Sequence, residues 1–331
     1  MSNTPNTTTT TYRDALRAGL RDAMLADDTV VVIGEEVGVY GGAYGVTKDL
    51  IKEFGAGRLI DTPISEPAII GAAVGAAMTG LRPVAELMYV DFLGMTMDQL
   101  GNQAAKIRYM FGGQIGVPMV LRTQGGTGRS AGAQHSQSLE AMVMHTPGLR
   151  LAMPATASDA YHLLRHSLTL PDPVVFIEHK ALYARKEEAD LTTPIAPWGK
   201  AAIRRPGRDV TLVTYSRMVH VSLEAARVLA ERGIEVEVID LRTLNPLDME
   251  TVVASVNRTG RAVAVSEAPM TSGVAAELAA RISEECFDFL EDPVLRLAGE
   301  DIPVSVSPEL ESASIPTVGL IVDAISRMVA R

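Results

Sequence analysis

The sequence predicts an α/β protein made of two three-layer domains, each with a mostly parallel sheet. Three observations support this prediction: helical and strand patterns alternate in the first half of the chain, a charged and proline-bearing stretch interrupts them at residues 185–200, and the alternation then restarts. Strands that alternate with helices are typical of parallel sheets covered on both faces. The chain has 331 residues, of which 47% are hydrophobic, and this is enough for two such domains.

The elements of the first domain, residues 12–184, are predicted from their hydrophobic periodicity. A helix at 14–25 is followed by a β-branched strand at 29–33 and by a loop that contains Glu35 and Glu36. Further helices are expected at 46–54, 67–79 and 91–111, and further strands at 83–90, 117–122, 149–153 and 173–177. Residues 1–11, which end in a run of five threonines, are expected to form a disordered tail.

The second domain is expected over residues 201–331, after a linker at 185–200. Its predicted strands are 210–214, 235–239, 262–265 and 294–297, and its predicted helices are 219–232, 272–284 and 317–328. Polar residues follow several of these strands, at the positions where α/β proteins place their binding sites.

Charge and cysteine content limit the class of protein. The formal net charge is −10 and no block of Lys or Arg occurs, which argues against nucleic acid or an anionic membrane as the main partner. The longest apolar stretch, near residues 69–78, is too short to span a bilayer. Cys286 is the single cysteine, so an internal disulfide is excluded, and the start of the chain has no targeting pattern; both fit a cytoplasmic protein.

Glu66 is the first candidate for catalysis. It closes the segment Asp61-Thr62-Pro63-Ile64-Ser65-Glu66 and stands at the start of a predicted helix of small and apolar residues. A carboxyl group that is buried among apolar residues favours its protonated form, and such a group can exchange a proton with a ring nitrogen. The alternative interpretation is an acidic residue that the helix dipole favours at a helix N-terminus. Gly71 and Gly75, four residues apart in this helix, predict a closely packed internal or subunit interface.

His135 is the second candidate. It lies between Gln134 and Ser136, beyond a glycine-rich loop that follows the strand at 117–122, where an acid/base group would be presented. The alternative is a histidine that caps a helix beginning near Ser136. The loop itself, Gly126-Thr127-Gly128-Arg129-Ser130-Ala131, fits a GxGxxA dinucleotide fingerprint. That match is weak, because no acidic residue follows at the required spacing of about 20 positions.

Taken together, these segments resemble the β subunit of the E1 component of 2-oxo acid dehydrogenase complexes. The resemblance runs from about Tyr12 to the C-terminus. It is carried by the segments at 34–37, 61–66, 80–83, 133–137 and 240–248, and by the spacing of Glu66, Gly71 and Gly75. It implies a transketolase-like pyrimidine-binding domain followed by a transketolase C-terminal domain.

The resemblance also implies thiamine diphosphate as the cofactor. Glu66 would then bond to the pyrimidine ring nitrogen N1′, and His135 would transfer a proton or orient the substrate or lipoyl group during acyl transfer. Met88 and Phe92 match positions that line the pyrimidine pocket, with plain core packing as the alternative. Glu35 and Glu36 would support the glutamate, with a solvated loop as the alternative.

The partners follow from a motif that this chain lacks. Enzymes that use thiamine diphosphate hold the diphosphate through Mg²⁺ with a Gly-Asp-Gly motif and a downstream Asn, and this chain has no Gly-Asp-Gly. The resemblance therefore implies that an α subunit holds the Mg²⁺, that the cofactor is shared in an α2β2 assembly, and that this chain has no metal site of its own for it. A lipoyl-bearing E2 acyltransferase would dock on the second domain through acidic residues, namely Glu284, Glu285, Asp288, Glu291, Asp292, Glu300 and Asp301. A solvated acidic face is the alternative for most of them.

The expected substrate is pyruvate, oxidatively decarboxylated with transfer of the acyl group to lipoyl-E2. Acetoin dehydrogenase is a close alternative, because the segments at 91–99, 109–113 and 178–180 look somewhat like acetoin-type members. A branched-chain 2-oxo acid enzyme and a non-catalytic assembly subunit are the remaining alternatives. Some members of the family hold a structural potassium ion with carbonyls near residues 167–172, but Leu170 here replaces the usual acidic side chain, which counts against that ion.

Overall fold

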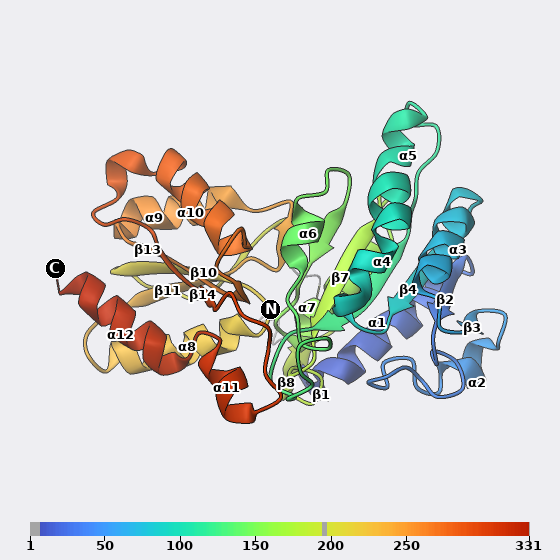
Figure 1. Cartoon of the computed structure of the whole chain (residues 1–331), viewed down its shortest axis with the longest axis horizontal. Coiled ribbons are helices and arrows are strands. Elements are labelled where there is room, and N and C mark those ends of the chain that lie inside the picture. The colour runs from blue at the N-terminus through green and yellow to red at the C-terminus, as the bar shows by residue number, and fades with distance from the viewer. Residues whose placement is uncertain (1–6, 194–196, 331) are drawn as a thin grey trace, which may run out of the picture. The chain divides into compact units, whose positions relative to one another are not determined.

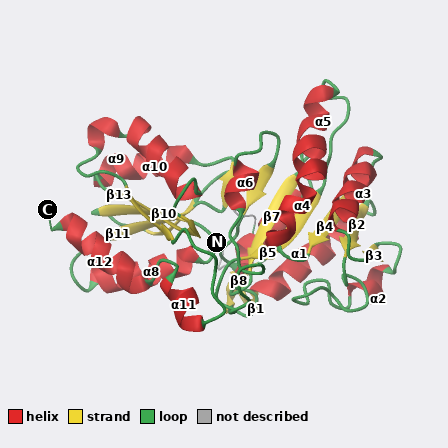
Figure 2. Ribbon diagram, in the orientation of Figure 1, coloured by secondary structure: helices red, strands yellow, loops and turns green. Residues whose placement is uncertain are grey.

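The computed structural model describes residues 7–193 and 197–330 and confirms the α/β fold (Figure 1). The chain divides into two compact units. Unit 1 contains Met1–Gly125 and Met142–Trp198, and unit 2 contains Gly126–Ala141 and Gly199–Arg331. Each unit has its own sheet (Figure 2) and is described by itself.

The sheet of unit 1 is parallel, as predicted, and has the strand order β6-β7-β5-β4-β2-β3. Its strands are β2 (Val30–Gly34), β3 (Leu59–Asp61), β4 (Arg82–Leu87), β5 (Val120–Gly125), β6 (Arg150–Ala152) and β7 (Val174–His179). Because these strands are parallel, their carboxyl ends meet at one edge of the sheet, where α/β proteins bind ligands. We call this edge the carboxyl edge of unit 1.

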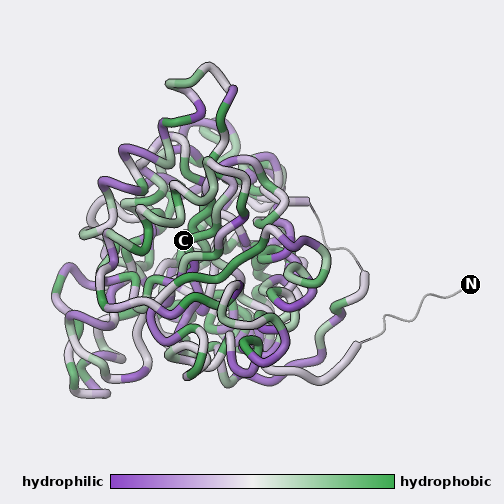
Figure 3. The backbone as a smooth tube through the Cα atoms, turned by 90° about the vertical axis from the view of Figure 1, so that its right-hand side faces the viewer, coloured by the Kyte–Doolittle hydropathy of each residue, from purple (hydrophilic) through white to green (hydrophobic). Residues whose placement is uncertain are grey.

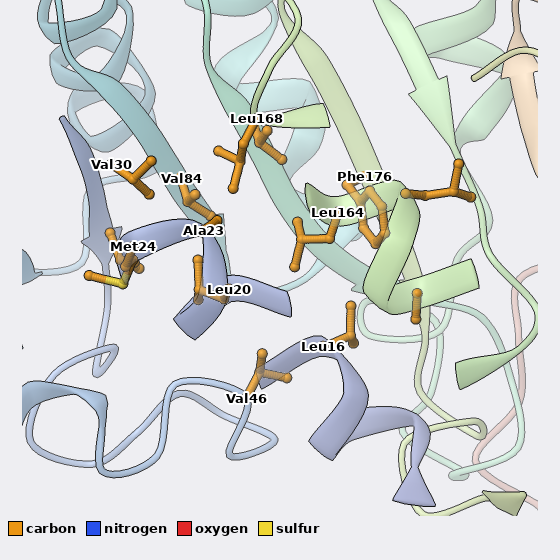
Figure 4. Packing of buried hydrophobic residues seen from close by; sticks show 14 of the residues in the cluster. Leu16, Leu20, Ala23, Met24, Val30, Val46, Val84, Leu164, Leu168 and Phe176 are labelled. Atoms are coloured by element: carbon orange, nitrogen blue, oxygen red, sulfur yellow. The ribbon is translucent and has the colours of Figure 1, made fainter. Parts of the chain in front are cut away.

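The helices of unit 1 cover this sheet. They are α1 (Tyr12–Ala26), α2 (Leu50–Phe54), α3 (Glu66–Met78), α4 (Leu93–Met97), α5 (Ala105–Met110) and α7 (Ala157–Ser167). Leu16, Leu20 and Met24 of α1 pack with Leu164 of α7 and Phe176 of β7 in one buried cluster (Figure 4). Thr11 and Thr156 cap the two helices by accepting hydrogen bonds from the backbone N–H groups of Asp14 and Asp159.

The predicted helix at 91–111 is continuous in the structure but irregular. A 3-10 turn at Val90–Phe92 leads into α4, and a π-helical segment at Asp98–Ala104 joins α4 to α5. The predicted helix at 46–54 is shortened to α2, and α7, which the sequence analysis did not predict, follows β6. Helix α3 lies against β4 and against the π-helical segment.

The threonine run does not belong to a disordered tail. Thr7–Thr11 form strand β1, which pairs antiparallel with β8 (Lys186–Asp190), inside the stretch expected to be a linker. Threonine is β-branched and favours extended backbone, and β8 supplies the hydrogen-bond partners that a tail would lack. Residues 1–6 of the expected tail lie outside the described residues.

Unit 2 has a sheet of order β14-β13-β10-β11-β9 in which only β9 runs antiparallel to its neighbour. The strands are β9 (Ala202–Arg205), β10 (Val210–Thr214), β11 (Val236–Asp240), β13 (Ala262–Pro269) and β14 (Leu295–Gly299), and a short strand β12 spans Thr243–Asn245. The helices are α8 (Met218–Ala230), α9 (Met249–Thr259), α10 (Val274–Glu285), α11 (Pro308–Ala313) and α12 (Val318–Val329), with a 3-10 turn at Phe287–Phe289. Hydrophobic and hydrophilic segments follow each other along the backbone (Figure 3), as is typical of helices with one buried face.

The stretch Pro308–Val329 is long and apolar enough, by length and composition, to cross a membrane. In the structure it is two helices, α11 and α12, separated at Ser314–Thr317. Ile321, Val322 and Ile325 of α12 are buried in the core of unit 2. Helix α12 is therefore a core element of unit 2.

Gly148 offers a test of the packing in unit 1. Its φ is +101°, and a Cβ atom there would lie 2.0 Å from the carbonyl oxygen of Ala105. We expect Gly148→Ala to destabilise the protein by more than about 2 kcal/mol, because the left-handed backbone and the clash add together. Gly55→Ala is the matched control: its φ is +77° with nothing within 4 Å of the added Cβ. Urea unfolding should give a clearly larger loss for Gly148→Ala, and equal losses would contradict the clash.

Candidate cofactor and catalytic site

Two buried carboxyl groups lie at the carboxyl edge of unit 1. Glu35 directly follows β2, and Glu66 is the first residue of α3, which follows β3. Both side chains are buried, with 8% and 9% of their surface exposed. Glu36, by contrast, is exposed.

Backbone contacts bring the two loops together. The carboxylate of Asp61 accepts hydrogen bonds from the N–H groups of Gly38 (2.5 Å) and Val39 (3.1 Å), and the N–H of Thr62 donates to the carbonyl of Gly34 (3.0 Å). A Cβ atom at Gly38 would lie 2.7 Å from the Asp61 carboxylate, so a larger residue at this position would displace that side chain. The loop after β2 is thereby tied to the segment that leads into Glu66.

The two carboxyl groups interact electrostatically. Burial raises the pKa of Glu35, and the negative charge of Glu66 raises the pKa of Glu35 further. The raised pKa of Glu35 favours its protonated form, which suits proton exchange with a ligand.

Met88 and Phe92 lie beyond the end of β4, at the same edge, and both are half-buried. The side-chain amide of Gln124 donates a hydrogen bond to the carbonyl of Met88. The rings of Tyr89 and Phe92 meet edge to face with centroids 6.2 Å apart. Lys180, fully buried after β7, has its Nζ 5.8 Å from the centre of the Tyr89 ring. These contacts hold the 88–92 segment on the sheet.

An ion network is buried on this sheet. Arg122 of β5 bonds to both carboxylate oxygens of Glu178 and, through Nη1, to Glu86 at 2.7 Å, and Tyr183 donates to Glu178 at 2.5 Å. Burial raises the pKa of Glu86, and the Arg122 charge opposes that shift. The charged groups of this network bond to one another, so the network stabilises the sheet that carries the 88–92 segment.

His135 lies in unit 2, in the loop 126–141. Its backbone N–H donates a hydrogen bond to the carbonyl of Gly132 (3.2 Å). Helix α6 (Glu140–Met144) begins five residues beyond His135, so the histidine is not the cap of that helix. Glu140 is buried, accepts a hydrogen bond from Tyr215 at 2.7 Å and has a pKa raised by burial.

The glycine-rich loop does not offer its N–H groups to a dinucleotide. The N–H of Thr127 donates to Glu267 (2.6 Å), and the N–H groups of Gly128 (2.9 Å) and Ser130 (3.1 Å) donate to Glu311. Protein carboxylates therefore occupy the position that a phosphate takes in the fingerprint loops.

Two kinds of cation site are relevant here: a cluster of metal-ligating side chains, and the carbonyl groups near residues 167–172. No group of three or more His, Cys, Asp or Glu side chains that could hold a metal ion occurs among residues 7–193 and 197–330. In the segment compared above with a potassium site, Arg82 Nη1 donates to the carbonyls of Leu168 (2.8 Å) and Leu170 (3.4 Å). A guanidinium cation already lies on these carbonyls.

Comparisons with known proteins bear on the family. Residues 8–186 match the family model "Transketolase, pyrimidine binding domain", and residues 199–321 match "Transketolase, C-terminal domain". The chain is 45% identical over 318 residues to the pyruvate dehydrogenase E1 component subunit beta of Rhizobium meliloti (strain 1021), covering 96% of this chain and 69% of that protein. It is 44% identical over 320 residues to the acetoin:2,6-dichlorophenolindophenol oxidoreductase subunit beta of Cupriavidus necator, covering 94% of both.

This chain belongs to the E1 β-subunit family of pyruvate and acetoin dehydrogenases. The E1 β chain also resembles a solved structure, a split-gene transketolase described as an inactive beta4 tetramer, with a TM-score of 0.80 and 20% identity over 96% of this chain and 98% of the other. That likeness concerns the fold alone. The relatives are named as β subunits, which implies an α-subunit partner, and the pyrimidine-binding domain belongs to a family that binds thiamine diphosphate.

The residues at the carboxyl edge of unit 1 fit an aminopyrimidine. Besides the two carboxyl groups, Oε1 of Gln124 and Oγ1 of Thr62 are buried without a hydrogen-bond partner among the described residues. Buried polar atoms that lack a protein partner are available to a polar ligand. An aminopyrimidine ring offers both the N–H donors and the ring-nitrogen acceptor that such groups require.

Three residues of this edge, Gln124, Lys180 and Asp61, are not among the site residues predicted from the sequence. For Gln124 and Lys180 the available signal was a polar residue at the end of a buried strand, whereas Glu35 was indicated by the family resemblance. For Asp61 the carboxylate had been noted only as part of the segment before Glu66. Asp61 holds the loop after β2 by accepting a hydrogen bond from Gly38, which lies 23 positions earlier in the chain.

Proposed function

We propose that the E1 β chain forms an α2β2 enzyme with an α subunit, oxidatively decarboxylates a 2-oxo acid, with pyruvate as the preferred substrate, and passes the acyl group to lipoyl-E2. The observation that carries the proposal is the pair of buried carboxyl groups, Glu35 and Glu66, at the carboxyl edge of a pyrimidine-binding domain. When bound, thiamine diphosphate would supply the nucleophilic carbon and the electron sink for decarboxylation.

Each site residue has a proposed role in this reaction. Glu66 exchanges a proton with the pyrimidine nitrogen N1′, and Glu35 keeps that proton available within the pair. Met88 and Phe92 line the pyrimidine. His135 moves a proton or orients the lipoyl group during acyl transfer. Mg²⁺ and the diphosphate are assigned to the α subunit.

The partners are proposed on similar grounds. The outward side of α3 carries Ala68, Ala72 and Gly75, with open space around Gly75, which suits close packing against an α subunit.

For lipoyl-E2 we propose the acidic end of α10 and the turn that follows it. There Glu285 pairs with Arg281 and Glu291 pairs with Arg261, whereas Glu284, Asp288 and the rings of Phe287 and Phe289 are exposed. The single, buried Cys286 suits a reducing compartment such as the cytoplasm.

Acetoin is the second candidate substrate. The identity to pyruvate-type relatives (45%) and to acetoin-type relatives (44%) is nearly equal, so identity does not favour either substrate. The acetoin-type relative is matched along 94% of its own length. The substrate pocket would be completed by the α subunit, which carries much of this specificity.

The test is turnover by this chain after co-expression with its α subunit. The complex receives thiamine diphosphate and Mg²⁺, and pyruvate, branched-chain 2-oxo acids and acetoin are compared with an artificial electron acceptor. We expect pyruvate to have the highest kcat/KM and the isolated β chain to be inactive. Acetoin turnover with little pyruvate activity would transfer the assignment to acetoin. A well-formed complex without activity on any of the three would contradict the catalytic proposal.

A further inference from the structure

The loop 126–141 is built around two buried carboxylates that come from distant parts of unit 2. Glu267 lies on β13 and Glu311 on α11, and both side chains are buried, with 8% and 4% of their surface exposed. Neither residue belongs to the site described above. Their hydrogen bonds to this loop are of the charge-assisted kind, which is the stronger class.

The backbone of the loop is shaped to receive a carboxylate. Gly126, Gly128, Ser130 and Gly132 have positive φ values of 83°, 90°, 51° and 79°. Left-handed residues at alternate positions turn successive N–H groups to one side and form a concave anion site. Glu311 fills this site: its Oε1 accepts from Gly128 (2.9 Å), and its Oε2 accepts from the N–H (3.1 Å) and the hydroxyl (3.4 Å) of Ser130.

The start of the loop is held by a second carboxylate. Glu267 accepts from the N–H of Thr127 at 2.6 Å, and Arg217 bonds to both Thr127 Oγ1 (2.8 Å) and Glu267 (3.3 Å). The second half of the loop rests on the segment before α11, because a Cβ atom at Gly132 would lie 2.9 Å from Val306. His135 follows three residues later and bonds back to Gly132.

We propose that Glu311, assisted by Glu267, is a positioning residue that fixes the loop 126–141 in the shape that presents His135. The inference rests on the proposed role of His135 in acyl transfer. The carboxylate of Glu311 is the anion that the concave loop needs, and without it the N–H groups of Gly128 and Ser130 lose their acceptor. The loop then relaxes, and His135 leaves the geometry required for acyl transfer.

The test uses the α/β complex and separates the two halves of the reaction. Decarboxylation is measured with an artificial electron acceptor, and acyl transfer with the lipoyl domain of the cognate E2. The variants are Glu311→Gln, which keeps the shape and removes the charge, and His135→Gln. Glu309→Gln, an exposed residue of the same helix, is the matched control.

We expect Glu311→Gln to lower kcat for acyl transfer between about 10-fold and 100-fold, the size typical of a misplaced catalytic group, and to change decarboxylation less than about twofold. His135→Gln should show the same pattern, and the double variant should be no worse than the more affected single variant. Glu309→Gln should match the unmodified complex. Additive losses, or unchanged acyl transfer in Glu311→Gln, would overturn the proposal.

Hydrogen exchange gives a readout that does not depend on activity. The amides of Gly128 and Ser130 should exchange at least about tenfold faster in Glu311→Gln, and unchanged exchange would overturn the proposal. If Glu311→Gln does not assemble, Glu311→Asp, whose carboxylate is one methylene shorter, undergoes the same comparison with the same expected direction. If His135→Gln leaves both half-reactions unchanged while the amides of Glu311→Gln exchange faster, the role of His135 fails and the anchoring of the loop stands.

Discussion

Replacing Glu66 with glutamine is expected to lower decarboxylation by the α/β complex by about 10²- to 10⁴-fold, the usual contribution of a positioned acid/base group. Glutamine has nearly the size of glutamate, so the start of α3 should be unchanged. Its carboxamide has no proton to exchange with a ring nitrogen at neutral pH. The measurement is the initial rate with pyruvate and an artificial electron acceptor, at saturating thiamine diphosphate and Mg²⁺.

Glu36→Gln is the control for this experiment. Glu36 lies next to Glu35 in the same loop but is exposed, so its replacement should leave the rate within about twofold of the unmodified complex. Size-exclusion chromatography should show the same assembly for both variants. Unchanged turnover in Glu66→Gln, with normal assembly, would refute the assigned role.

Replacing Arg122 with methionine is expected to lower the free energy of unfolding by about 3–5 kcal/mol, the cost of removing one partner of a buried ion pair. Arg122 has 1% of its side chain exposed and bonds to Glu86 and Glu178, which have 4% and 0% exposed. Methionine fills similar space but leaves two buried carboxylates without their cation. Urea unfolding can be followed by the fluorescence of Trp198, the single tryptophan, which packs against the core of unit 1.

The decrease in the free energy of unfolding of Arg122→Met should depend on pH in a defined direction. Burial already raises the pKa of Glu86, and without the Arg122 charge this pKa rises further. A carboxyl group whose folded pKa is above its unfolded value binds protons preferentially in the folded state. The destabilisation is therefore largest at neutral pH and decreases as the pH falls through the raised folded pKa toward the unfolded value.

Arg227→Met is the control for the ion network. Arg227 forms ion pairs with Glu224 and Glu231 on the surface of α8, and its side chain is 60% exposed. Ion pairs on the surface contribute little to the free energy of unfolding, so no measurable change in the unfolding midpoint is expected. A loss in Arg122→Met no larger than that in the control would show that the buried network does not stabilise the fold.

The alternation of strands and helices could be predicted from the sequence because each element carries its own hydrophobic periodicity. The mostly parallel sheets and most of the helices follow from it, and the family resemblance is confirmed by the comparisons. Strand β1 could not be predicted, because five threonines form a strand only when β8, about 180 residues later, supplies the pairing. The π-helical segment at Asp98–Ala104 likewise has no periodicity that separates it from an α-helix.

By itself, the sequence determined which residue types are available for chemistry: Glu66 before an apolar helix, His135 after a glycine-rich loop, and no Gly-Asp-Gly motif. Only the tertiary structure decided how they are held. Asp61 draws the Glu35 loop toward Glu66, and Glu311 fills the loop of His135 from a position 183 residues away from Gly128. The physical reason is that periodicity and turn chemistry act over a few residues, whereas burial of a carboxyl group and the choice of its partner depend on contacts that exist only after the chain has folded.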